Sequence, residues 1–171
     1  LPGGAPDREH AGGRPYTRPA VITATLHPAD FQRVLDRYLD LLRTYRDDLN
    51  RLNVYPVPDG DTGTNMALTI ESVVDAVSDA HQMPALAAAI SHGSLMGAQG
   101  NSGIILSQVL RGFSDVMVDL PAVGSRDLAA ALRRAAPAAY EGVGTPVEGT
   151  MLTVLRAAAA EAGGAAASGG W

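Results

Sequence analysis

Apolar residues recur along most of this chain at three- and four-residue steps, the spacing of one face of an α-helix. The first such stretch predicts one amphipathic helix from Pro28 to Leu52, with an apolar stripe of Phe31, Val34, Leu35, Tyr38, Leu42, Tyr45, Leu49 and Leu52. We expect the two tyrosines of this stripe to pack in the core rather than to stack on a ligand. The same periodicity predicts helices over residues 65–81 and 84–95, the former with Met66, Ile70, Val73, Val74 and Val77 facing inward.

Capping residues predict where three later helices begin. Ser102 is placed to cap a helix with a broad apolar surface that runs to about Asp119. Ser125 is placed to cap another to about Tyr140, with a kink or interruption near Pro137. The stretch Thr145-Pro-Val-Glu148 has the spacing of a capping box with proline at the first helical position, and predicts a sixth helix to about Ala162.

Both ends of the chain lack this periodicity. Residues 1–26 carry glycine, proline and arginine, and residues 163–171 are almost all small, so we expect two disordered tails around one helical domain at 27–162. The first residue is leucine rather than methionine, and we expect a fragment or a misplaced start.

Composition favours an all-α fold in a single domain. The 171 residues are 46% hydrophobic but only 5% aromatic, and alanine is abundant, which suits helices packed through small residues. The net charge is −5, and the 13 cationic residues are all arginine without a basic cluster, so nucleic-acid binding is disfavoured. The absence of lysine excludes a P-loop lysine and Schiff-base chemistry, and the absence of cysteine excludes thiolate sites.

Targeting and catalytic signals are few. No apolar run approaches the roughly 20 residues of a membrane span, and residues 1–19 lack the apolar core of a signal peptide. A soluble cytoplasmic protein is therefore expected. The four histidines show no paired ligand spacing, and no catalytic histidine is assigned.

Two aspartates carry the clearest candidate chemistry. Asp59 and Asp61 flank Gly60, which lets the backbone turn so that both carboxylates can face one hard cation. A plain Asx turn explains the same triplet, whereas an EF-hand does not, because Thr64 and Ile70 stand where its glycine and glutamate belong. The next residues, 62–65, lead into a helix start whose amides and dipole favour phosphate.

Two further segments precede or begin predicted helices. Gly97-Ala-Gln-Gly-Asn-Ser-Gly103 could cradle a phosphate oxygen with its amides and the Ser102 hydroxyl, or could be a tight turn with a serine cap. Gly149-Thr-Met151 could present a hydroxyl and a soft side chain to an adenine or ribose, or could simply follow the cap of its helix.

Two motifs in this order resemble a known family. Leu52-Asn-Val-Tyr-Pro-Val-Pro-Asp-Gly-Asp-Thr-Gly-Thr-Asn-Met66 and Gly97-Ala-Gln-Gly-Asn-Ser-Gly-Ile-Ile-Leu-Ser-Gln108 are similar to the DhaL-like nucleotide-binding domain of the fatty acid kinase A subunit. That domain is related to the L subunit of dihydroxyacetone kinase. The resemblance covers roughly residues 28–162.

The resemblance implies a fold, two cofactors and a set of site residues. The implied fold is an antiparallel barrel of roughly eight amphipathic helices that binds Mg²⁺ and ATP at one rim. The implied metal ligands are Asn53, Asp59 and Asp61. The implied nucleotide contacts are Thr62, Gly63, Thr64, Asn65, Gly100, Asn101 and Ser102 for the phosphates, with Thr150 and Met151 near the nucleoside.

The implied activity is transfer of the γ-phosphoryl group of ATP to a fatty acid carboxylate held by a fatty-acid-binding partner protein. Family members continue into a further helical pair and a closing loop, so we expect a barrel truncated at its C-terminal end that is inactive alone. Two alternatives are a dihydroxyacetone (glycerone) kinase L-type subunit and a nonenzymatic helical interaction domain. Asn53 favours the fatty acid kinase, since the dihydroxyacetone branch carries aspartate there.

Overall fold

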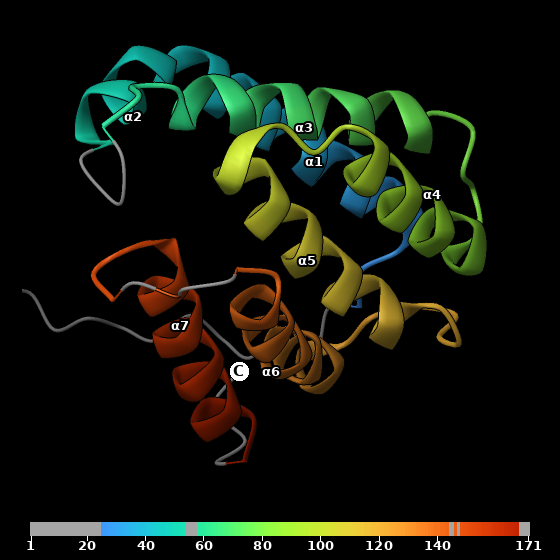
Figure 1. The fold of residues 1–171 in the computed structure, drawn as a ribbon. Coiled ribbons are helices and arrows are strands. Elements are labelled where there is room, and N and C mark those ends of the chain that lie inside the picture. Colours follow the sequence, from blue (N-terminus) through green and yellow to red (C-terminus); the bar gives the residue numbers. More distant parts are fainter. Residues whose placement is uncertain (1–24, 54–57, 144–145, 147, 168–171) are drawn as a thin grey trace, which may run out of the picture.

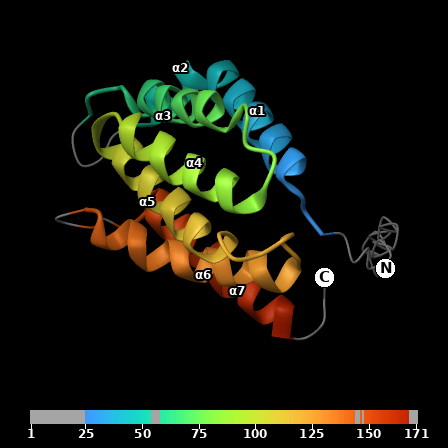
Figure 2. The ribbon, with the colours of Figure 1, turned by 90° about the vertical axis from the view of Figure 1, so that its right-hand side faces the viewer.

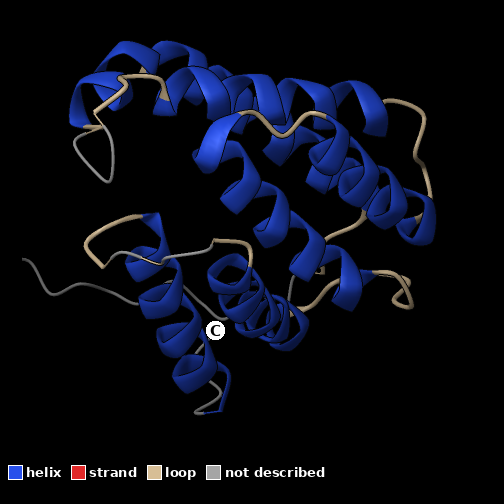
Figure 3. Cartoon of the chain, in the orientation of Figure 1, coloured by secondary structure: helices blue, strands red, loops and turns tan. Residues whose placement is uncertain are grey.

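The computed structural model describes residues 25–53, 58–143, 146 and 148–167, and this part of the chain holds seven α-helices and no strand. Their bounds are α1 (Pro28–Thr44), α2 (Arg46–Leu52), α3 (Thr62–Val77), α4 (Met83–Met96), α5 (Gly100–Met117), α6 (Ser125–Glu141) and α7 (Met151–Ala167). Figure 3, coloured by secondary structure, shows these helices joined by loops. The predicted all-α class is confirmed, with one described helix more than the six predicted from periodicity.

The first predicted helix is two helices. Tyr45, with φ −100° and ψ 12°, separates α1 from α2. Leu35 and Leu42 are buried as expected, but Tyr45 is 54% exposed and Leu52 is 74% exposed. The prediction of one continuous apolar stripe to Leu52 is therefore wrong. Val34 is already 59% exposed within α1. After the break, which changes the phase of the helix, Leu49 still packs against the core while Tyr45 and Leu52 do not.

The predicted serine caps are each displaced. Gln99 is the N-cap of α5, so Ser102 lies inside the first turn. The amide of Gly124, the N-cap of α6, donates to Asp127 Oδ2 at 2.9 Å, and Ser125 is the first helical residue. The Asp127 carboxylate at the third helical position thus satisfies the amide of the N-cap residue, which is one half of a capping box, and no serine side chain caps this helix. The α6 helix continues through Pro137 without interruption.

The last helix begins and ends later than predicted. Gly149 has φ +82°, outside the helical region of backbone conformation, and α7 starts at Met151. Thr145 and Val147 of the predicted capping box lie outside the described residues. At the other end, residues 163–167 belong to α7 rather than to a tail.

The structured region begins before residue 27. Leu26 and Val123 exchange two backbone hydrogen bonds of 2.8 and 2.9 Å in an isolated antiparallel bridge. Leu26 also packs against the core. The expectation that the N-terminal tail extends to residue 26 is therefore wrong at its last residue, while residues 1–24 and 168–171 lie outside the described part.

The core forms around α3, which packs against α1, α2, α4 and α5. Ile70, Val73 and Leu86 are fully buried at its centre. Small residues allow the helices to approach closely elsewhere: a methyl group placed on Gly112 of α5 would lie 2.5 Å from Ala135 Cα of α6. The abundance of alanine and glycine in the sequence is thus used for helix packing, as predicted.

Helices α3, α4 and α5 alternate in direction. Gly97 near the end of α4 lies against Ser72 of α3, and Gly93 lies against Ala76, so α3 and α4 are antiparallel. The chain reverses again into α5, which therefore runs parallel to α3. Their N-terminal ends lie at the same end of the domain, as Figures 1 and 2 show.

The same alternation continues to α7. Gly142 at the end of α6 lies against Gln108 of α5, and Arg156 near the start of α7 lies over the ring of Tyr140 near the end of α6. Helix α7 therefore runs parallel to α5 and starts at the end of the domain where α3 and α5 start (Figures 1 and 2). No helix among the described residues is long and apolar enough to cross a bilayer.

Candidate functional site

The loop between α2 and α3 brings two of the three predicted metal ligands together. Asn53 Nδ2 donates to the Asp59 carboxylate, although residues 54–57 between them lie outside the described part. Gly60 has φ +67°, the sharp turn expected of it, and carries the chain into Asp61. Asp61 is the N-cap of α3, and its carbonyl accepts the Asn65 amide at 2.8 Å.

These side chains offer oxygen ligands of the kind that hard cations prefer. Asp59 is exposed, and Asn53 and Asp61 are half-buried at the protein surface. The described residues contain no group of three or more His, Cys, Asp or Glu side chains placed to hold a metal. Two carboxylates and one amide oxygen would suit a Mg²⁺ ion that completes its shell with water and phosphate oxygens, as this ion does in phosphoryl-transfer sites.

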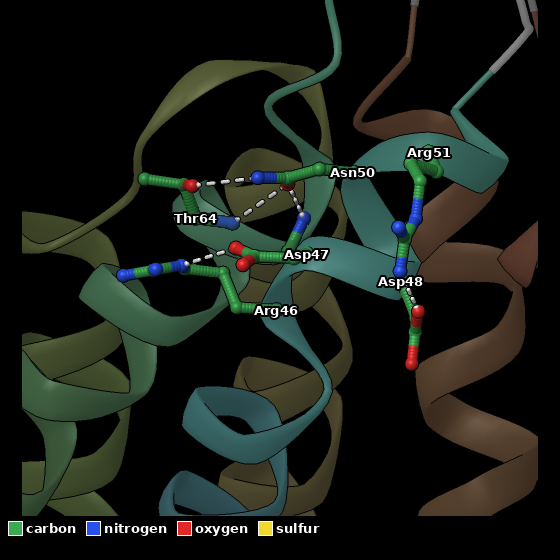
Figure 4. A network of polar contacts seen from close by, with 7 residues as sticks. Arg46, Asp47, Asp48, Asn50, Arg51 and Thr64 are labelled. Carbon is green, nitrogen blue, oxygen red and sulfur yellow. Dashed lines mark hydrogen bonds and ion pairs between the residues drawn. The ribbon is translucent and has the colours of Figure 1, made fainter.

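Helix α3 starts against a polar side chain of α2. The amides of Gly63 and Thr64 donate to Asn50 Oδ1 at 2.8 and 3.2 Å, and Asn50 Nδ2 donates to Thr64 Oγ1 at 3.1 Å. Figure 4 shows Asn50 facing Thr64 across the two helices. The expectation that the amides of this helix start favour phosphate therefore does not hold for those of Gly63 and Thr64, which already donate to Asn50. The spacing of residues in the sequence gave no signal for Asn50, because this residue belongs to α2 and its partners belong to α3.

Glycine is required where α2 meets α3. A methyl group on Gly63 would lie 2.4 Å from the Arg46 carbonyl and 2.9 Å from Leu49 Cβ. The pairs Arg46–Asp47 and Arg51–Asp48 lie on the outer surface of α2 (Figure 4), where exposed ion pairs contribute little to stability. Close backbone contact and Asn50, rather than these pairs, hold α2 on the start of α3.

The start of α5 touches the start of α3. Gly100 has φ +57°, and a methyl group on it would lie 2.3 Å from Asn65 Nδ2. One turn further along α3, Thr69 Oγ1 accepts the Gln99 amide at 3.3 Å and lies close to Gly103. The two motifs singled out in the sequence therefore adjoin in space, since parallel helices bring their first turns side by side.

The first turn of α5 is capped differently from that of α3. The side chain of its N-cap residue, Gln99, makes no capping hydrogen bond, and Gly100 and Asn101 are exposed. Ser102 is 9% exposed, on the side of the turn that faces the protein. A helix start with exposed glycine and asparagine and no side-chain cap offers amides and a positive dipole end to an anion.

The loop before α7 is held by Glu148. Its carboxylate accepts Thr153 Oγ1 at 2.6 Å, both terminal nitrogens of Arg156 at 2.8 Å, and the Tyr140 hydroxyl at 3.1 Å. The Gly149 amide donates to Thr153 Oγ1 at 2.8 Å. The hydrogen bond from Thr153, followed by those from Tyr140 and Arg156, lowers the pKa of Glu148 below its usual value.

Thr150 and Met151 follow directly after the Glu148 contacts in the chain. They lie at the end of the domain where α3 and α5 start, because α7 runs parallel to α5 (Figures 1 and 2). The Asn65–Gly100 and Thr69–Gln99 contacts do not include them, and α7 packs on α6 within the described part of the chain. The structure thus brings the first two predicted segments into contact and leaves the third at the same end.

Known proteins resemble this chain over the same segments. A family model described as the DAK2 domain matches residues 56–169. An uncharacterized protein of Staphylococcus saprophyticus is 47% identical over 120 residues, which are 69% of this chain and 22% of that protein. Protein YloV of Bacillus subtilis is 47% identical over 116 residues, 67% of this chain and 21% of its own length.

The matched relatives are much longer than this chain. The chain spans about a fifth of the length of the curated relatives it matches. The DAK2 match covers more than half of the chain, from the loop before α3 to beyond the end of α7. The chain therefore belongs to the DAK2 domain family, a kinase-related family of DhaL-like nucleotide-binding domains.

Proposed function

We propose that this domain binds Mg·ATP where α3, α5 and α7 begin, and that it is the ATP-binding part of a fatty acid kinase. The contact between Asn65 and Gly100 carries this proposal. It places the loop of Asp59 and Asp61 beside the loop of residues 97–100. A cation bound at the first loop and phosphate oxygens bound at the second could therefore belong to the same Mg·ATP. A hydrogen-bonded turn of α3, about 5.4 Å long, separates Asp61 from Asn65.

Within this site we assign Asn53, Asp59 and Asp61 to Mg²⁺. The ion would offset phosphate charge, and the residues around it would fix the position of the transferred group. Thr62, Thr64 and Asn65 would contact phosphate through side chains, since Asn50 occupies the amides of Gly63 and Thr64. The uncapped turn at Gly100, Asn101 and Ser102 would contribute backbone amides.

Thr150 and Met151 are assigned to the nucleoside. Their support is the shared end of the domain and the Glu148 contacts that fix the loop before them. In the proposed reaction a carboxylate oxygen of the fatty acid attacks the γ-phosphorus, and the bond from that phosphorus to the ADP oxygen breaks. The fatty acid would be presented by a separate binding protein, and the remaining length of the relatives gives room for domains that engage it.

A dihydroxyacetone kinase subunit would use the same metal and phosphate site for a different acceptor. The amide of Asn53 beside Asp59 supports the fatty acid kinase, because the dihydroxyacetone branch carries a third carboxylate at this place. The acceptor experiment is to incubate the full-length protein with Mg·ATP and either an acyl-loaded binding protein or dihydroxyacetone. Acyl phosphate formation is the expected result, and phosphorylation of the ketose alone would overturn it.

Calorimetric titration tests the metal site. We expect the parent chain to bind ATP with Mg²⁺ and to lose most of that affinity without it, because each carboxylate supplies both an oxygen ligand and a charge. Asp59→Asn and Asp61→Asn keep the side-chain shape and should each weaken binding. Asp36→Asn makes the same charge change on the exposed surface of α1 and should bind as the parent does. Equal affinity in every setting would contradict the assignment.

A further inference from the structure

Asn50 uses both ends of its side-chain amide on the first turn of α3. We propose that Asn50 is a positioning residue that keeps the Thr64 hydroxyl proton directed at the bound phosphate. The proposal rests on the Mg·ATP site described above. It concerns a residue that belongs to α2 and lies outside both loops assigned to the ligand.

The orientation of the Asn50 amide follows from its partners. Two backbone amides, those of Gly63 and Thr64, point at one end of the side chain at 2.8 and 3.2 Å. Backbone amides can only donate, so the atom that faces them must be the carbonyl oxygen. The NH₂ group is thereby turned to Thr64 Oγ1, 3.1 Å away.

This orientation decides the role of the Thr64 hydroxyl. A hydroxyl has one proton to donate and can accept as well. Because Asn50 Nδ2 donates to Thr64 Oγ1, the oxygen is an acceptor toward α2, and its own proton remains for another acceptor. The next threonine on α3 differs, since Thr69 donates its proton to the Asn65 carbonyl at 2.7 Å. The described residues show no such acceptor for Thr64.

An aspartate in place of Asn50 would reverse that hydrogen bond. A carboxylate would still accept the amides of Gly63 and Thr64, and aspartate is as good as asparagine at a helix start. It has no proton to give, so it would accept the Thr64 proton as well and draw it away from the phosphate. The isosteric change Asn50→Asp therefore separates capping of α3 from orientation of the hydroxyl.

The test measures Mg·ATP affinity and the melting temperature of the 171-residue chain. Asn50→Asp should melt at or above the temperature of the parent and bind Mg·ATP at least about tenfold more weakly, the loss of roughly one charge-assisted hydrogen bond. Asn50→Ala should lower the melting temperature, because it leaves the half-buried amides of Gly63 and Thr64 without their acceptor. Thr64→Ser keeps the hydroxyl and should bind nearly as the parent does, whereas Thr64→Val should bind weakly.

A double-mutant cycle separates orientation from simple charge repulsion. Repulsion between the carboxylate introduced by Asn50→Asp and the phosphate would weaken binding by the same factor with Thr64 or with Thr64→Val. If Asn50 acts through the hydroxyl, Asn50→Asp should cost much less affinity in the Thr64→Val background. Equal factors in the two backgrounds, or Asn50→Asp binding as the parent does, would overturn the inference.

The outcomes also separate this inference from the proposed function. If the parent binds Mg·ATP, Asp59→Asn weakens binding and the cycle shows no coupling, only the role of Asn50 is wrong. A parent that binds no Mg·ATP, or that binds it equally well after Asp59→Asn and Asp61→Asn, would contradict the metal site and the Asn50 role together.

Discussion

Leu42 on α1 lies in a buried cluster with Leu39, Ile70 and Leu106, and only 4% of it is exposed. Its truncation removes apolar contacts and leaves a cavity among these side chains. We expect Leu42→Ala to lower the free energy of unfolding by about 2–5 kcal/mol, measured by urea denaturation. Leu52→Ala, at a position 74% exposed, should change it by only about 0.5 kcal/mol. If Leu42→Ala lowered the free energy of unfolding as little as Leu52→Ala, this face of α1 would not be in the core.

Single residues of the site differ in how far sequence could identify them. The Asp59-Gly60-Asp61 triplet predicts a turn with two carboxylates, and Gly60 does have the positive φ that such a turn needs. Asn50 has no comparable signature, because asparagine within a helix is ordinarily a solvated surface residue. Its capping role exists only because α2 lies across the first turn of α3.

The stability of closely packed helix pairs such as α5 and α6 depends on glycine at the contact. Gly112→Ala should lower the free energy of unfolding by about 1–3 kcal/mol, because the new methyl group would lie 2.5 Å from Ala135 Cα and 2.8 Å from Ala135 N. Gly164→Ala is the matched control on α7, since a methyl group there meets nothing within 4 Å. It should raise stability by about 0.5–1 kcal/mol through helix propensity. Thermal or urea unfolding compares the two, and loss of stability in both would contradict the packing argument.

The junction of α6 and α7 should respond to acid through Glu148. Its pKa is lowered in the folded state, so the contribution of its contacts is present above the ordinary carboxyl pKa and is lost as pH falls through the lowered value. We expect a carboxyl-detected NMR titration of Glu148 to give a pKa below the ordinary glutamate range. Thr153→Val should move it upward, because the Thr153 hydroxyl is the largest cause of the shift. Thr153→Ser should not, and an unchanged pKa in Thr153→Val would contradict the assignment.

Across the whole molecule, stability should fall from the centre to the edges. Helix α3 packs on four other helices, whereas α2 buries none of its residues and α7 packs on α6. We expect native-state hydrogen exchange to show the slowest amides in α3 and α4, exchanging only through global unfolding. Amides of α2 and α7 should exchange through smaller openings. Equal exchange free energies in all seven described helices would indicate one cooperative unit instead.

The shared end of the domain at which α3, α5 and α7 start also depends on the whole molecule. Residues 62–65, 100–102 and 150–151 are far apart in sequence, and each follows a different loop. They share one end because successive helices alternate in direction, so that every second helix starts on the same side. The structure shows contact between the first two of these segments, at Asn65 and Gly100, and the nucleotide site at this end is our proposal.

Local chemistry accounts for the features that were predictable from the order of residues. Helical periodicity depends on the spacing of apolar residues, so it identified the all-α class and the inward side chains Ile70, Val73 and Val77. The break at Tyr45, the start of α7 after Gly149 and the contact between Asn50 and Thr64 had no such signal. Each depends on which helices pack together and at what angle, and that balance of burial and backbone hydrogen bonding is settled only when the whole chain folds.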